Sequence, residues 1–233
     1  MIDVITVIST GMPRVGKRCR ASVAAQRGVS RVEHVCVDAG VGKLRTKLEN
    51  VVTACAGLPA DRVVALVDGD DWLERDWALA RVVQEHDAGA LATYGSYLCE
   101  HGEPGCAAPY QPGEMPRVTH WRATHLKTFR AGLVQRIEPA HLRLASGEWI
   151  DRADDMAIMF PVLEMAASRA HFIPDVLYRY NRVDSFEHNS TADERAHQDR
   201  CVAYIRRLPH YLPIDDLEGR GAPFDERATG GPS

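Results

Sequence analysis

Apolar and polar positions over residues 2–98 follow two periods, one typical of strands and the other of helices. Short β-branched and apolar runs predict buried strands at residues 2–9, 32–37, 63–67 and 90–98. Helices are predicted through Cys19 and Gln26, over residues 75–86, and over a stretch with one apolar face formed by Leu44, Leu48, Val51, Val52 and Cys55. This alternation predicts a parallel, doubly wound α/β sheet that binds ligands beyond the carboxyl ends of its strands.

The chain beyond this region begins with a predicted loop and a basic stretch. Residues 100–116 are rich in Gly and Pro and predict a long loop. Residues 117–143 contain one carboxylate, Glu138, and six cations, which are Arg117, Arg122, Lys127, Arg130, Arg136 and Arg143. We interpret this stretch as a solvated helix face around Phe129, Leu133 and Ile137, with one or two contacts to a diphosphate. The alternative is a surface for nucleic acid or a lipid headgroup, with stacking by Trp121, His125 and Phe129.

The last part of the chain predicts two helices and a hairpin. A helix begins at Asp154, and Pro161 should kink or restart it. Residues 171–173 and 176–178 are predicted to form a hairpin or paired strands around Pro174 and Asp175. A final helix covers residues 192–208.

Composition narrows the class of protein. A chain of 233 residues that is 45% hydrophobic suits one large α/β domain and excludes disorder as the dominant state. A net charge of −4 argues against a basic coat for nucleic acid. Six cysteines lie scattered without a CxxC pair, so we expect free thiols rather than structural zinc. With no apolar run long enough to span a membrane and no signal peptide, we expect a cytoplasmic protein.

Carboxylates gather where two predicted strands end. Residues 68–71 read Asp-Gly-Asp-Asp directly after one strand, and Asp38 ends its neighbour. Clustered carboxylates repel one another unless a cation is bound, and Mg²⁺ or Mn²⁺ uses carboxylate oxygens together with substrate phosphates. The pattern therefore indicates a divalent-metal site. The alternative is a strand-to-helix turn in which Asp70 or Asp71 caps a helix ahead of Trp72.

A second acidic group lies at the start of the later helix. Asp154 and Asp155 are adjacent, and Asp151 lies just upstream. The helix dipole stabilises carboxylates at this position, which is a purely structural explanation. Like charges in a crevice also raise the pKa of one carboxyl, which suits a general base. The pattern by itself leaves both roles open.

Five segments, in this order and spacing, resemble the family 2 glycosyltransferases, which have the GT-A fold. Residues 22–26 (SVAAQ) are similar to the family's SxxxQ helix, and residues 35–40 (VCVDAG) stand where the family reads vvDDGS. Residues 66–71 (LVDGDD) resemble its lDaDD metal motif, and residues 154–155 its ED base motif. Residues 173–181 (IPDVLYRYN) are similar to its closing evLyxYr segment. The resemblance covers residues 2–190.

The resemblance implies a Rossmann-like, mainly parallel sheet flanked by helices, with a smaller acceptor-side region. We expect a single GT-A domain over residues 1–212. Within it, residues 1–99 would form the nucleotide-sugar-binding half and residues 117–212 the acceptor and catalytic half. A mobile tail would follow over residues 213–233.

The resemblance also implies the reaction and its residues. One sugar passes with inversion from a nucleoside diphosphate sugar, a UDP-sugar being favoured, to an acceptor hydroxyl that Asp155 deprotonates. Donor-binding residues would be Thr10, Asp38, Lys47 and Asp68. Ligands of Mn²⁺ or Mg²⁺ would be Asp70 and His188, although a surface-loop role for His188 stays open. The acceptor side would include Asp154, Trp121 and Arg122.

The chain also departs from the family pattern. Ala39 and Gly40 replace the usual second Asp and Ser, and Asp154 replaces a Glu. The lack of a membrane span favours a single-sugar transferase over a processive synthase. The acceptor is left open between a glycan precursor and a hydroxymethylated base in DNA. Nucleotidyl transfer, Asp-x-Asp phosphatase chemistry and a catalytically inactive nucleotide-sugar binding module are the competing functions.

Overall fold

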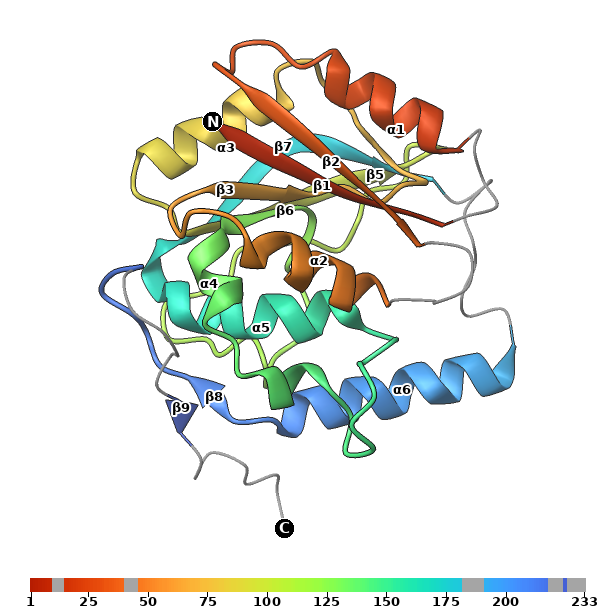
Figure 1. Ribbon diagram of the computed structural model, residues 1–233, viewed down its shortest axis with the longest axis vertical. Helices are drawn as coiled ribbons and strands as arrows, with labels where there is room; N and C mark the ends of the chain where they lie inside the picture. The colour runs from red at the N-terminus through yellow and green to blue at the C-terminus, as the bar shows by residue number, and fades with distance from the viewer. Residues whose placement is uncertain (10–14, 40–45, 182–190, 218–223, 226–233) are drawn as a thin grey trace.

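The computed structural model describes residues 1–9, 15–39, 46–181, 191–217 and 224–225. At its centre is a seven-stranded sheet in the order β2-β1-β3-β6-β5-β7-β4 (Figure 1). The strands are β1 (Ile2–Ser9), β2 (Val32–Ala39), β3 (Val63–Leu66), β4 (Trp72–Leu73), β5 (Ala92–Cys99), β6 (Thr124–Arg130) and β7 (Ala170–Tyr180). β1 pairs in parallel with β2 and β3, and β5 with β7, whereas β6 runs antiparallel between β3 and β5. The predicted α/β class with a mainly parallel sheet is confirmed.

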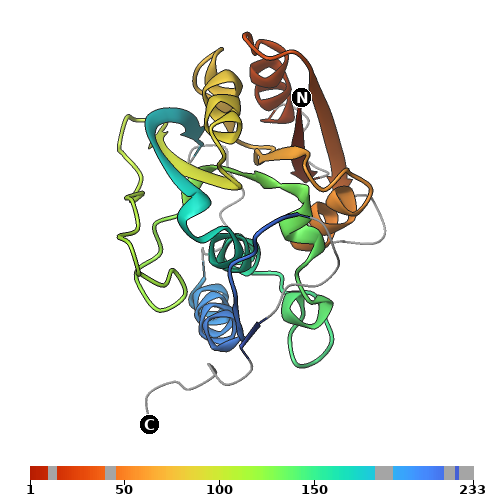
Figure 2. The same ribbon diagram turned by 90° about the vertical axis from the view of Figure 1, so that its left-hand side faces the viewer.

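Helices cover both faces of the sheet. On one face lie α1 (Val15–Ala24) and α3 (Ala78–Asp87), and on the other lie α2 (Lys47–Ala56), α4 (Ala131–Gln135) and α5 (Asp154–Ala166) (Figure 2). The longest helix, α6 (Ala192–Arg207), packs outside α5. The short strands β8 (His210–Tyr211) and β9 (Phe224–Asp225) pair beside it, and 3-10 turns span Pro139–Leu142 and Ala167–Arg169. Within the described ranges, no helix is both long and apolar enough to cross a membrane.

β3 shows why its segment reads as a continuous apolar run. Val63 and Ala65 pack into the core under α1 and α3, whereas Val64 and Leu66 pack into the core under α2 and α5. Successive side chains of a strand point to opposite faces, so a strand with a core on each side is apolar at every position. β3 lies between β1 and β6 near the centre of the sheet, and the acidic turn follows its carboxyl end.

The basic stretch is not the solvated helix that its composition predicted. Residues 124–130 form the central strand β6, and Phe129 is fully buried beneath α4. Lys127 is 1% exposed. Lys127 and Phe129 are two residues apart and face the same side of the sheet, and the surrounding cations hid this strand period. The solvated-face interpretation is therefore wrong, and a strand between β3 and β5 replaces it.

Two predictions about prolines also need correction. β7 is one strand rather than a hairpin, and its pairing with β5 shifts register so that Pro174 and Asp175 have no partners in β5. Proline has no N–H to donate, and a register irregularity is where a sheet accommodates it. α5 does not restart at Pro161, which is buried inside the continuous helix. The predicted final helix agrees with α6.

A buried ion pair joins the loop before β6 to two helices. Arg117 is 1% exposed and holds Glu164 of α5 through two nitrogens, Nε at 2.7 Å and Nη2 at 2.9 Å. Its Nη1 donates to the carbonyl of Ile205 in α6 at 2.6 Å. A guanidinium with all its partners fixed in this way is structural. Arg117 therefore adds nothing to a basic surface.

Replacing Arg117 with Leu leaves the Glu164 carboxylate buried without its counter-charge. We expect the free energy of unfolding to fall by about 3–5 kcal/mol, measured by urea denaturation. Arg122→Leu is the matched control, because its partner Glu114 is 25% exposed and the loss should stay under about 1 kcal/mol. Equal losses in the two variants would show that Arg117 is not a structural anchor.

Candidate functional site

Hydrogen bonds connect the acidic turn after β3, residues 68–71, to the end of β7. Asp71 is 1% exposed, and its Oδ1 accepts the N–H of Asn181 at 2.8 Å. The Tyr178 hydroxyl donates to Asp71 Oδ2 at 2.7 Å and accepts the N–H of Asp68 at 3.0 Å. The Asn181 side chain donates to the carbonyl of Asp70 at 3.0 Å. Both Asp71 oxygens therefore serve the fold, and β4 rather than a capped helix follows the turn.

Beside this turn, Lys47 forms ion pairs with three carboxylates. Its Nζ lies 2.7 Å from Asp68 Oδ1, 3.2 Å from Asp154 Oδ2 and 3.5 Å from Asp155 Oδ1. Lys47 is the first residue of α2, whose preceding residue Thr46 caps the helix by accepting the N–H of Glu49. One ammonium group thus joins the end of β3 to the start of α5. We call these four residues together with Lys127 the carboxylate–lysine cluster.

β6 supplies the second cation. Leu66 at the end of β3 is in register with Lys127, because β6 runs antiparallel to β3. Lys127 Nζ consequently lies 2.5 Å from Asp155 Oδ2. His125 lies two residues earlier in β6 and stacks on the Tyr178 ring, with centroids 4.4 Å apart. The antiparallel insertion of β6 thus delivers both groups to the carboxyl end of β3.

The pKa values of the two α5 carboxyls are shifted in opposite directions. Burial alone would raise the pKa of Asp155, but the charges of Lys127 and Lys47 outweigh it and hold that pKa below its ordinary value. Burial raises the pKa of Asp154, and the neighbouring Asp155 adds to the shift. Asp155 is therefore held ionised at neutral pH, and it keeps 28% side-chain exposure. An ionised and accessible carboxylate is the form that accepts a proton.

The pKa values of Lys47, His125 and Asp71 are also shifted by burial and by neighbouring charges. Burial would lower the pKa of Lys47, but the surrounding carboxylates raise it well above its ordinary value. Burial, followed by the charge of Lys127, lowers the pKa of His125 to about 3, so its imidazole is neutral at pH 7. Burial, followed by the charges of Asp68 and Asp70, raises the pKa of Asp71. The hydrogen bonds from Asn181 and Tyr178 oppose this shift.

The backbone at the start of α5 is strained where it presents Asp154 and Asp155. Ala153 has φ 55°, a left-handed conformation that costs a non-glycine residue about 1 kcal/mol or more. No side chain caps this helix end. The first-turn carboxylates instead face the positive end of the helix dipole. Residues in such conformations cluster at functional sites, where the surrounding structure holds them in place.

The structure brings together only some of the residues that the sequence singled out. Lys47, Asp68, Asp154 and Asp155 meet in the carboxylate–lysine cluster, and Asp70 lies half-buried in the adjoining turn.

Trp121 and Arg122 have partners of their own: Trp121 packs edge-on against Phe160, and Arg122 pairs with Glu114 at 2.8 Å. Asp38 closes β2, and its side chain is outside the described part of the structure, as are Thr10 and His188 altogether.

Sequence reasoning gave other roles to Lys127 and His125, and it gave Tyr178 no role of its own. The many cations of residues 117–143 indicate surface positions, whereas Lys127 lies buried in a strand beside Asp155 and His125 stacks on Tyr178. Tyr178 was noted only as part of a closing motif. Its hydroxyl bonds to Asp68 and Asp71 depend on β7 passing beneath the turn, which the sequence does not reveal.

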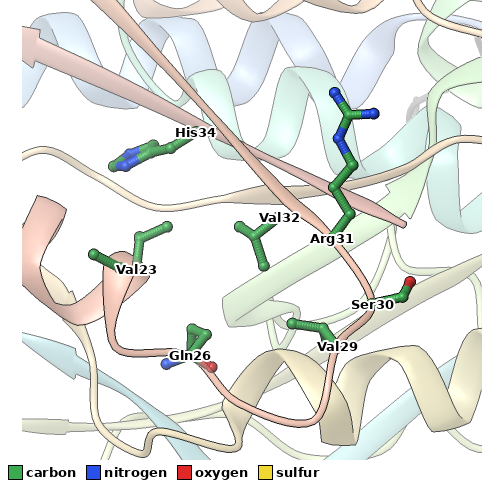
Figure 3. A pocket seen from close by; sticks show the side chains of 8 residues that line it. Val23, Gln26, Val29, Ser30, Arg31, Val32 and His34 are labelled. Carbon is green, nitrogen blue, oxygen red and sulfur yellow. The ribbon is translucent and has the colours of Figure 1, made fainter.

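A hollow of about 320 Å³ lies away from this cluster (Figure 3). It is lined by the end of α1 and the start of β2, including Val23, Gln26, Arg31 and His34. β2 is parallel to β1 and β3, so this hollow lies toward the amino ends of these strands. The acidic turn lies at the opposite, carboxyl end, which is where open α/β sheets bind ligands.

The residues around the turn fit a hard divalent cation. Ligand atoms of Asp68, Asp71 and His125 lie within 4.8 Å of one another. Asp71 already uses both oxygens, which leaves Asp68, Asp70 and the neutral imidazole as donors. His125 Nδ1 is buried and has no hydrogen-bond partner among the described residues. Carboxylate oxygens with one imidazole suit Mn²⁺ or Mg²⁺.

Solved structures share this arrangement of strands and helices. A crystal structure of S. aureus TarS 1–349 matches with a TM-score of 0.56 and 16% identity, over 88% of this chain and 70% of that one. The same piece in complex with UDP-GlcNAc matches with a TM-score of 0.59 at 16% identity, over 88% of this chain and 66% of that one. The fold is that of GT-A glycosyltransferases.

Further comparisons show how much of each chain the structural similarity covers and whether it extends to the sequence. TarS 1–349 in complex with UDP matches with a TM-score of 0.53 at 16% identity, over 89% of this chain and 66% of that one. This chain spans only 43% of a longer TarS structure. In sequence, the chain matches neither a protein-family model nor a curated protein. The likeness therefore establishes the GT-A fold and no narrower family.

Replacing Lys127 with Met removes the charge nearest to Asp155. In the wild type the pKa of Asp155 is below its ordinary value of 3.8. The ion pair therefore stabilises the fold at neutral pH, and this contribution is lost only as the pH falls below about 4. In the variant Lys47 is, among the described residues, the one lysine left to oppose burial, so the pKa of Asp155 should rise. We expect a loss of up to about 3 kcal/mol at neutral pH, shrinking toward about pH 4 as Asp155 takes up a proton.

The measurement is thermal unfolding of wild type and Lys127→Met across this pH range. Lys17→Met, on the exposed side of α1, is the control and should show no pH-dependent difference. A loss in Lys127→Met that is the same at every pH would mean that Lys127 does not govern the ionisation of Asp155.

Proposed function

We propose that this protein is a nucleotide-sugar-dependent glycosyltransferase that moves one sugar to an acceptor hydroxyl with inversion. The proposal rests chiefly on the carboxylate–lysine cluster, in which Lys47 joins Asp68 to Asp154 and Asp155. The cluster lies at the carboxyl end of β3 in a GT-A fold. Such a position brings donor-binding groups and a candidate base within reach of one substrate.

The donor is a nucleoside diphosphate sugar, and a UDP-sugar is the best supported. Crystal structures of TarS in complex with UDP-GlcNAc and with UDP share this fold. Asp68 is positioned to meet the ribose or the cation, and Lys47 offers an ammonium group to the diphosphate. The expected base contacts of Thr10 and Asp38 belong to the same proposal. So does the assignment to family 2.

Mn²⁺ or Mg²⁺ would be held by Asp70, with Asp68 and His125 as the nearest further donors. The cation would neutralise charge on the departing diphosphate. Asp71 lies beneath these donors and keeps the turn in place through Tyr178 and Asn181. His188 remains a proposed ligand of the same ion.

Asp155 is the proposed general base. The acceptor oxygen attacks the anomeric carbon while its proton passes to the Asp155 carboxylate. The bond between that carbon and the diphosphate oxygen breaks, and its electron pair leaves with the diphosphate. Lys127 and Lys47 keep Asp155 ionised in the resting enzyme. Asp154, whose pKa is raised, positions Lys47 instead of acting as the base.

The acceptor hydroxyl belongs, in this proposal, to a glycan precursor. The case for DNA depended on an exposed basic stretch, but Arg117, Lys127 and Arg136 are buried. A stretch that keeps these cations inside cannot neutralise many phosphates. We assign residues 1–99 to the donor half and residues 117–212 to the acceptor half.

Asp155→Asn should lower turnover by roughly 10²-fold or more, the scale of a lost general base. Release of UDP from UDP-GlcNAc in the presence of Mn²⁺ is the assay, with water or an added glycan as acceptor. Donor affinity should stay near that of the wild type, and thermal unfolding checks the fold. Asp87→Asn, exposed at the end of α3, is the control. Undiminished turnover in Asp155→Asn would remove Asp155 from the mechanism.

Asp70→Ala tests the metal. We expect Mn²⁺ to strengthen UDP-sugar binding in the wild type and to have little effect in the variant, as measured by thermal shift. Asp76→Ala, in the exposed segment after β4, is the control. Stabilisation by nucleoside triphosphates alone would favour nucleotidyl transfer instead. Equal Mn²⁺ dependence in wild type and Asp70→Ala would mean that Asp70 does not hold the ion.

A further inference from the structure

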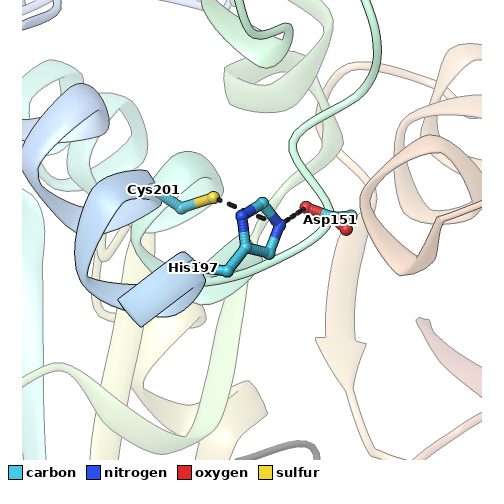
Figure 4. Close-up of side chains that lie close together, drawn as sticks. All are labelled: Asp151, His197 and Cys201. Carbon is cyan, nitrogen blue, oxygen red and sulfur yellow. Dashed lines mark hydrogen bonds and ion pairs between the residues drawn. The ribbon is translucent and has the colours of Figure 1, made fainter. Parts of the chain in front are cut away.

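A second group of metal-ligand side chains lies outside the carboxylate–lysine cluster. His197 Nε2 is 2.8 Å from Asp151 Oδ1 and 3.9 Å from Cys201 Sγ (Figure 4). The carboxylate, imidazole and thiol atoms all lie within 4.8 Å of one another. Nothing in the proposed transfer reaction uses them.

The sequence brings these groups together for a definite geometric reason. His197 and Cys201 are four residues apart in α6, so they lie on one face of that helix. Asp151 comes from the segment just before α5, and α5 and α6 pack together. Cys201 is 2% exposed, whereas His197 and Asp151 are partly exposed. A dissolved ion can therefore approach from the side of the imidazole and the carboxylate.

The separations are close to those of a tetrahedral zinc centre. Bonds of about 2.3 Å to sulfur and 2.0–2.2 Å to nitrogen and oxygen put ligand atoms roughly 3.3–3.6 Å apart. The observed N···O separation is shorter by about half an ångström, and the S···N separation is longer by a few tenths. Small side-chain rotations would bring both to these values, and the third pair, Asp151 and Cys201, lies within 4.8 Å. Three protein ligands leave a fourth position for water or substrate.

We propose that Asp151, His197 and Cys201 form a binding site for a zinc-class ion. A thiolate with an imidazole selects Zn²⁺ over Mg²⁺ or Mn²⁺, which prefer oxygen ligands. The site is thus chemically distinct from the proposed donor-side metal.

The surroundings of Cys201 make ion binding release a proton. Burial, followed by the charge of Asp151, raises the pKa of the thiol, which is protonated at neutral pH without a metal. The backbone N–H of Arg152 and the charges of Arg152 and Arg200 act in the opposite direction and stabilise a thiolate. When the sulfur–metal bond forms, the S–H bond breaks and its proton goes to solvent.

The bound ion would tie α6 to the chain three residues before Asp154. This tether would steady the segment that leads into the strained Ala153 and the first turn of α5. A metal that binds only the folded protein raises its melting temperature.

The test uses the full-length protein after removal of metals with a chelator. Co²⁺ is titrated in as the probe, and the absorption spectrum is recorded. We expect one equivalent to give the thiolate-to-cobalt charge-transfer band and the intense visible bands of a tetrahedral site, and Zn²⁺ to displace it. Cys201→Ser and His197→Ala should lose the charge-transfer band. Cys106→Ser and His120→Ala, both on the surface, are the matched controls and should keep it.

The outcomes separate this site from the transferase proposal. Asp70→Ala should retain the cobalt spectrum, because oxygen ligands give no thiolate band. Asp151→Ala, an exposed change that spares the core, should weaken Co²⁺ binding if Cys201→Ser fails to fold. A folded wild type without a thiolate band, or a band that persists in Cys201→Ser, would overturn the proposal. Neither result would affect the transferase proposal.

Discussion

The paired charges of Lys47 and Lys127 with three aspartates are the interaction on which the centre of this structure depends. Carboxylates are costly to bring together in a partly buried place unless cations compensate them. Lys47 forms ion pairs with Asp68, Asp154 and Asp155, and Lys127 forms an ion pair with Asp155. The starts of α2 and α5, the end of β3 and the middle of β6 are therefore held at one point.

This constraint also shapes the proposed chemistry. Two ammonium groups hold Asp155 ionised, and the same charges make it a weak base. A weak base suits a reaction in which the leaving group departs readily, as a nucleoside diphosphate does once its charge is neutralised. Arrival of an anionic donor beside Lys47 would draw that cation away from Asp155 and strengthen the base. In the proposed reaction, donor binding and proton acceptance would thereby be coupled through the Lys47 side chain.

The sequence predicted correctly those strands whose apolar pattern is not masked by charged residues. The runs that became β1, β2, β3 and β5 are short and rich in apolar and β-branched residues, which predicts strands. The strand-end acids Asp68 and Asp70 were found by the same logic. For β6, six cations in residues 117–143 masked a strand period, and their burial depended on partners distant in sequence, such as Glu164 for Arg117.

The sequence predicted only part of the candidate site, because contacts between residues distant in sequence complete it. Asp154 and Asp155 stood out as adjacent acids, but the lowered pKa of Asp155 depends on Lys127, which is supplied by the antiparallel strand inserted beside β3. Tyr178 and Asn181 reach Asp71 only because β7 passes under the turn. Local pattern locates acids at strand ends. Pairing across the sheet decides which acid is held ionised by lysines and which acid fastens the turn.

Calorimetric titration of UDP-GlcNAc in the presence of Mn²⁺, comparing wild type with Lys47→Met, tests most directly whether this cluster is a donor site. Loss of one charged contact to the diphosphate should weaken binding by about 10- to 100-fold. Lys17→Met should bind as the wild type does, and thermal unfolding verifies that each variant is folded. The account predicts binding by the wild type and a clear loss in Lys47→Met. No binding by the folded wild type, or equal affinity in both proteins, would contradict it.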